Sequence, residues 1–175
     1  MYANFRSGGL GSAFGQGKDA PYGSFQMLGN MYIRYKYPSS GGTTNYERVL
    51  SLNDAVATTK FTEGGITYQR EYFASHANDI LSTRITADKK KSISLDLSLN
   101  RSERANVWVK DNTLFMAGQL NDGNNGTKGV QYITKLQVLH TGGTLITGDS
   151  SLSVKSADEV IVLISTSNDM LDKDY

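Results

Sequence analysis

The sequence predicts an all-β protein folded as a two-sheet antiparallel β-sandwich, and three observations lead to this prediction. Residues that favour strands are frequent, glycine occurs 18 times and proline only twice. Several segments alternate apolar and polar residues with period two, which is typical of half-buried strands. These segments recur about every 8–12 residues with turn residues between them, as in sandwiches and barrels.

The first strand pattern begins at Phe25, and the sandwich domain is predicted to span residues 25–167. Residues 1–24 are predicted to form an irregular arm, because six glycines interrupt every apolar pattern there. Residues 25–37 form an aromatic and β-branched run that ends in the turn sequence beginning at Pro38. Residues 55–61 and 66–75 flank Gly64 and Gly65, which supply the positive φ angles of a tight hairpin. Residues 53–59 could also make one short helical turn.

The second half of the chain has the clearer strand signals. In residues 92–99, four apolar residues (Ile93, Leu95, Leu97 and Leu99) alternate with polar ones, so one face should be buried. Asp96, in the alternate positions, should face solvent. Asp111-Asn112 and Gly142-Gly143 are predicted turns. The remaining predicted strands are residues 80–87, 107–110, 114–120, 130–140, 152–154 and 160–166. Residues 168–175 are polar and charged, which indicates the start of a linker.

The composition narrows the function classes. The net charge is +1, from 18 basic and 17 acidic residues, whereas nucleic-acid binders carry a clustered basic excess. Cysteine is absent and histidine occurs only twice, so we predict no disulfide, no cysteine nucleophile and no metal site. The longest aliphatic run, residues 160–164, is far shorter than the ~20 residues of a membrane span. Residues 1–10 are polar and glycine-rich, without the apolar core of a signal peptide.

The motifs that could carry chemistry are all weak. The glycines of the arm lack the G-x-G-x-x-G spacing, so no nucleotide cofactor is predicted. The loop of residues 122–126 has glycine at the wrong position for an EF-hand. Ser75 and His76 are neighbours in a predicted strand and should point to opposite faces. Four acidic residues could in principle form the carboxylate pair of a glycosidase, but the sequence singles out no pair among Glu71, Asp79, Asp96 and Glu103.

Aromatic residues offer a further interpretation, because an exposed ring can stack on a sugar. The candidates for such a stacking surface are Tyr32, Tyr35, Tyr37, Tyr46, Tyr68, Tyr72, Phe73 and Trp108. Core packing or cross-strand pairing is the commoner role of aromatic residues on strands.

Three segments carry a family resemblance when taken together. They are FQMLGNMYI from Phe25, YERVLSL from Tyr46 and YQREYFAS from Tyr68. Their order and spacing resemble the N-terminal β-domain of glycoside hydrolase family 95, the inverting α-L-fucosidases. The resemblance covers about residues 22–87. Ser51 stands where that family usually has aspartate, which leaves α-L-fucosidase and a related specificity such as α-L-galactosidase both open.

The resemblance implies a super-sandwich β-domain, truncated at its N-terminal side, that supports a helical-toroid catalytic domain of the same polypeptide. The family's catalytic groups lie in that toroid, so no residue here inherits a catalytic role and no cofactor or metal is expected. Gln26 and Asn30 are candidates for substrate binding, because both are polar within an apolar signature. Backbone capping at a strand bend is their other interpretation. Arg70 and Glu71 are expected to form a structural ion pair.

The resemblance also implies a periplasmic or secreted location and fucosylated glycans as possible partners. Absent early strands would leave a sheet edge open, and open edges favour self-association. A stand-alone carbohydrate-binding or adhesin-type sandwich is the alternative function.

Overall fold

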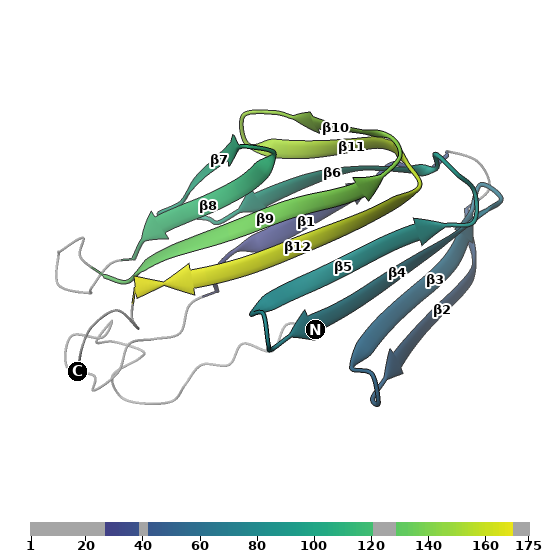
Figure 1. The fold of residues 1–175 in the computed structure, drawn as a ribbon, viewed down its shortest axis with the longest axis horizontal. Coiled ribbons are helices and arrows are strands. Elements are labelled where there is room, and N and C mark those ends of the chain that lie inside the picture. Colours follow the sequence, from purple (N-terminus) through teal and green to yellow (C-terminus); the bar gives the residue numbers. More distant parts are fainter. Residues whose placement is uncertain (1–26, 39–41, 121–128, 170–175) are drawn as a thin grey trace.

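The computed structural model describes residues 27–38, 42–120 and 129–169, which form two antiparallel sheets stacked as a sandwich (Figure 1). The predicted fold class is confirmed. The strands are β1 (Asn30–Tyr35), β2 (Thr43–Ser51), β3 (Val56–Glu63), β4 (Ile66–Ser75), β5 (Ile80–Ala87), β6 (Ile93–Asn100), β7 (Asn106–Lys110), β8 (Thr113–Gln119), β9 (Gln131–Thr141), β10 (Thr144–Thr147), β11 (Ser151–Ala157) and β12 (Glu159–Asn168).

The smaller sheet has four strands in the order β1-β6-β11-β10. Its central strand β6 buries Ile93, Leu95, Leu97 and Leu99, as the period-two pattern predicts. The intervening residues of β6 form the sheet's outer face, where Asp96 is partly exposed.

The larger sheet has eight strands in the order β2-β3-β4-β5-β12-β9-β8-β7. Tight hairpins build most of it. Gly64 and Gly65 both have positive φ between β3 and β4, as predicted. Asp111 and Asn112 also have positive φ, near 50°, between β7 and β8, which is the geometry of a two-residue type I′ turn. After β5 the chain crosses to the smaller sheet for β6, and it returns to the larger sheet for β7 to β9. It then adds β10 and β11 to the smaller sheet before β12 completes the larger one.

The main core lies between the smaller sheet and the β5-β12-β9-β8 part of the larger sheet. Its most buried side chains are at most 1% exposed and include Leu95, Leu97, Leu114, Leu136 and Val160. Side chains packed this closely carry the largest share of the apolar stabilisation, about 1.5–3 kcal/mol each.

The smaller sheet stops short of the far strands β2 to β4, as Figure 1 shows. A second cluster of Phe61, Ile66 and Tyr68 packs there against Tyr37, which follows β1. The edge strand β2 is exposed along almost its whole length, and Leu50 is 62% exposed. The inner face of the larger sheet is therefore only partly covered in the described residues.

The element predictions need four corrections. Strand β2 was not predicted, and neither was the short strand β10. The described part of the 25–37 run becomes strand only from Asn30. The helical turn considered for residues 53–59 is wrong, because β3 begins at Val56 and pairs with β2 and β4. The arm of residues 1–24 lies outside the described residues, and the boundaries at residues 25 and 167 stay predictions.

Candidate functional site

The two residues predicted to bind substrate are not brought together in the described structure. Gln26 lies outside the described residues. Asn30 is exposed at the start of β1, opposite Asn100 of β6 in the smaller sheet. Substrate contact by either residue stays a prediction.

Two of the four acidic residues considered for a catalytic pair, Glu71 and Asp96, are held apart. Glu71 of β4 accepts a hydrogen bond from Arg84 at 3.2 Å, on the outer face of the larger sheet. Asp96 of β6 accepts hydrogen bonds from Lys36 at 2.8 Å and from Ser153 at 2.7 Å, on the outer face of the smaller sheet. The Lys36 ammonium holds the pKa of Asp96 below its usual value. Since Glu71 and Asp96 lie on opposite faces of the sandwich, these two of the four candidates cannot face one another across a cleft.

The predicted Arg70–Glu71 ion pair is wrong. Neighbouring residues of a strand point to opposite faces, so Glu71 reaches Arg84 while Arg70 turns inward. Arg84 also donates to Glu159 at 2.8 Å, so it joins two carboxylates across the outer face.

Arg70 instead lies in an aromatic cage on the inner face. Its guanidinium carbon is 3.7 Å from the ring centre of Tyr35 and 4.8 Å from that of Phe61. A guanidinium N–H of Arg70 donates a hydrogen bond to the hydroxyl of Tyr37. Burial raises the pKa of Tyr37 to about 12, although the nearby guanidinium opposes the shift. The cage is a packed cluster of side chains, in which Arg70 lies beside the second cluster of Phe61, Ile66 and Tyr68.

Ser75 and His76 give no catalytic pair of their own. Ser75 Oγ accepts a hydrogen bond from the side chain of Asn78 at 3.0 Å, a contact within the β4–β5 turn. The loop of residues 122–126 lies outside the described residues.

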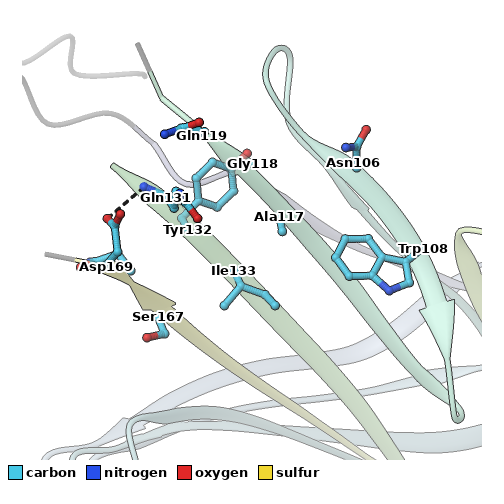
Figure 2. A pocket seen from close by; sticks show the side chains of 11 residues that line it. Asn106, Trp108, Ala117, Gly118, Gln119, Gln131, Tyr132, Ile133, Ser167 and Asp169 are labelled. Atoms are coloured by element: carbon cyan, nitrogen blue, oxygen red, sulfur yellow. Dashed lines mark hydrogen bonds between the residues drawn. The ribbon is translucent and has the colours of Figure 1, made fainter. Parts of the chain in front are cut away.

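The site with the best-developed geometry is a groove on the outer face of the larger sheet, at the end formed by β7, β8, β9 and β12 (Figure 2). Its volume is about 680 Å³. Trp108 forms one wall and stacks on Phe115, with ring centres 5.4 Å apart. Ala117 and Ile133 form the floor. Gly118 and Tyr132 also line the groove, and the other lining residues are polar, namely Asn106, Gln119, Gln131, Ser167, Asn168 and Asp169.

Hydrogen bonds fix the polar end of this groove. The carboxylate of Asp169 accepts from the backbone N–H of Gln131 at 3.0 Å. Gln119 Nε2 donates to the carbonyl of Gly129 at 3.2 Å. Below them, the Tyr132 hydroxyl donates to the carbonyl of Arg104 at 2.7 Å, and burial raises the pKa of Tyr132. The side-chain amide of Gln119 and the carboxylate of Asp169 are therefore held in place by hydrogen bonds within the chain.

Chemically, the groove offers an aromatic surface and hydrogen-bonding groups, which suit recognition. Among the described residues, no group of three His, Asp or Glu side chains could hold a metal ion. No helix within the described ranges is long and apolar enough to cross a membrane.

Sequence reasoning included Trp108 among eight aromatic candidates but did not find the groove. The usable signal is the alternation in the β7–β8 hairpin and in β9, where Trp108, Ala117 and Ile133 occupy solvent-facing positions. Their alignment depends on a register across three strands, which only the structure supplies.

Comparison with known proteins gives three similarities. The family model for the glycosyl hydrolase family 65 N-terminal domain matches residues 7–173. The chain is 27% identical over 169 residues to Alpha-L-fucosidase 2 of Arabidopsis thaliana; the match covers 85% of this chain and 20% of that protein. A protein from the human microbiome, provisionally named a kojibiose phosphorylase, has a similar fold with a TM-score of 0.58 and 11% identity.

That structural match covers 78% of this chain and 22% of the other, and at this identity it shows a shared fold alone. The chain spans about a fifth of the length of the curated relative that it matches.

Proposed function

Because this chain belongs to the family of glycosyl hydrolase family 65 N-terminal domains, we propose that it is the non-catalytic N-terminal β-sandwich segment of an inverting α-L-fucosidase. In this role it supports a helical-toroid catalytic domain in the same polypeptide. The observation that carries the proposal is the coverage: a match to most of this chain accounts for only a fifth of an α-L-fucosidase. The remaining four-fifths of such a protein can hold the catalytic machinery.

The positions of Glu71 and Asp96 support a non-catalytic role for these two candidates. An inverting mechanism needs an acid that protonates the leaving oxygen and a base that activates water on the other side of the sugar. Glu71 and Asp96 are each bound to a basic side chain, on opposite faces of the sandwich.

The test begins with the gene, read beyond codon 175. A longer polypeptide with repeated helical hairpins should release fucose from an aryl α-L-fucoside with inversion, as followed by NMR of the first anomer formed. The 175-residue chain alone should release none. Turnover by this chain, or a stop codon near Tyr175, would contradict the proposal.

The alternative, a stand-alone carbohydrate-binding sandwich, is favoured by the groove beside Trp108. A stop codon near Tyr175 together with glycan binding would support that function. The resemblance to family 95 further leads us to propose a periplasmic or secreted location, which fractionation of the source cells would test.

A further inference from the structure

The strand register places three rows of side chains across the outer face where the Trp108 groove lies. The first row is Trp108, Phe115 and Lys135. The second row is Asn106, Ala117, Ile133 and Ser167. The third row is Gln119 and Gln131, with Asp169 beside Gln131. The first row, with two aromatic side chains, and the third row, with amides and a carboxylate, therefore flank the second row. The middle members of the second row, Ala117 and Ile133, are small or aliphatic.

The middle row is hollow because Ala117 has a short side chain, and this leaves one side of the groove walled by the indole of Trp108. Ile133 is 41% exposed at the floor. The pair of stacked rings holds the indole in place, since Trp108 and Phe115 lie nearly parallel at 12°. A fixed aromatic wall beside an aliphatic floor favours a ligand that has a flat apolar face.

The third row supplies hydrogen-bonding groups on the other side of the middle row. Gln131 and Asp169 are linked through the 3.0 Å contact, and the remaining carboxylate oxygen of Asp169 can accept a hydroxyl proton. The amide of Gln119 in this row, and that of Asn106 at the end of the middle row, can both donate and accept. Among the described residues that line the groove there is no Lys or Arg, and the nearest basic residue in the three rows is Lys135 at the end of the first row. This lining favours a neutral ligand over phosphate or nucleic acid.

We propose that this groove is a binding site for a neutral saccharide, separate from the catalytic site that the proposed function assigns to another domain. The apolar face of a pyranose ring lies against Trp108 and Ile133, and its hydroxyls bind the amide–carboxylate row. A volume of about 680 Å³ is within the usual range for small-molecule sites. The inference rests on the groove and needs no contribution from a catalytic domain.

Trp108 is the single tryptophan of the chain, so its fluorescence reports directly on the groove. The 175-residue chain is titrated with 2′-fucosyllactose, kojibiose and lactose, and ligand-detected NMR provides an independent readout. We expect a saturable change in fluorescence with at least one of these saccharides, with a Kd on the order of 1 mM or tighter.

A matched pair of variants locates the site. Ile133→Lys introduces a long charged side chain into the floor and keeps the Trp108 reporter. Leu139→Lys places the same side chain on the same strand and face, where Leu139 is 48% exposed outside the groove. Ile133→Lys should weaken binding at least tenfold, whereas Leu139→Lys should change it less than twofold. Thermal unfolding of both variants confirms that they fold.

Three results would overturn the proposal. The first is no saturable signal by either method at 20 mM saccharide. The second is equal weakening of saccharide binding by both variants, and the third is an unchanged saccharide affinity in Ile133→Lys. A fourth concerns the longer polypeptide. If hydrogen exchange shows the outer face of β7 to β9 protected there but not in this chain, the groove is an interface between domains. These measurements involve no catalysis, so absence of fucosidase activity would count against the proposed function alone.

Discussion

Replacing Gly118 of β8 with alanine should strongly destabilise the domain for a steric reason. A Cβ atom at this position would lie 1.8 Å from the carbonyl oxygen of Arg104 and 2.8 Å from the hydroxyl of Tyr132. The first distance is more than 1 Å shorter than real Cβ contacts, and the atom it meets is backbone. The loop before β7 must therefore move away from β8.

That movement also breaks a buried hydrogen bond. The same Arg104 carbonyl accepts from the Tyr132 hydroxyl at 2.7 Å, and Tyr132 is only 7% exposed. Overpacking costs about 1–3 kcal/mol, and the lost hydrogen bond adds about 1 kcal/mol. We expect Gly118→Ala to lower the free energy of unfolding by about 3 kcal/mol and the Tm by roughly 6–12 °C.

A double-mutant cycle with Tyr132→Phe tests the mechanism. Tyr132→Phe alone should cost about 1 kcal/mol. The double variant should cost about 3 kcal/mol, less than the sum of the two, because the two changes lose the same hydrogen bond and the phenylalanine removes one of the clashing atoms. Urea unfolding followed by circular dichroism measures all three.

Gly65→Ala is the control, because a Cβ there has no heavy atom within 4 Å and meets only the strain of a φ of +75°. It should cost about 1–2 kcal/mol. The reasoning is refuted if Gly118→Ala costs no more than Gly65→Ala, or if the effects of Gly118→Ala and Tyr132→Phe add in full.

Three further predictions concern the part of the larger sheet that the smaller sheet leaves uncovered. Arg70→Lys should lower the free energy of unfolding by about 1 kcal/mol in urea titrations, because an ammonium cannot stack flat on the ring of Tyr35 at 3.7 Å; equal stability would contradict the cage. The tyrosine Tyr37, with a folded pKa of about 12 and an ordinary pKa of 10.0, contributes stability that is fully present below pH 10 and lost as the pH rises to 12. The loss should be on the order of 1 kcal/mol after solvent screening, and Tyr37→Phe should reduce it in unfolding curves measured from pH 9 to 12. Light scattering should show concentration-dependent self-association of this chain through exposed strands, reduced by Leu50→Lys in β2; a monodisperse monomer at high concentration would count against it.

The strands that could be predicted are those whose two faces differ. Strand β6 alternates fully buried leucines with polar residues, and β9 does the same around Leu136 and Val138. Local turn chemistry was equally informative, since Asp111-Asn112 adopts the positive φ angles that a two-residue hairpin requires. In both cases the physical cause lies within about ten residues of sequence.

Strand β2 was missed because both of its faces are exposed. Tyr46, Val49 and Leu50 are all at least half exposed, so no period-two pattern of burial shaped its sequence. Strand β10 has only four residues, too few for a period to be read. Edge strands that bury little carry little sequence signal.

The site features were missed for a different reason, which is that they depend on register between distant segments. Glu71 and Arg84 are opposite one another only because β4 and β5 pair in one alignment, and a slip of one strand by one residue would place the two side chains on opposite faces. The Trp108 groove needs β7, β8, β9 and β12 aligned together. Neighbours in sequence, such as Arg70 and Glu71, were therefore a poor guide to partners in space.

The unequal sizes of the two sheets explain why an arginine lies in the aromatic cage. Within the described residues, the four-stranded sheet does not cover the inner face of all eight strands, and the covered part of the core ends beside β1 and β4. Tyr35, Tyr37 and Phe61 supply apolar surface on the core side, and the half-buried Arg70 guanidinium lies over their rings. An aliphatic residue at position 70 would expose apolar area, and a carboxylate would be repelled by the ring faces. The charge at Arg70 is thus explained by the edge of the sandwich, without any ligand.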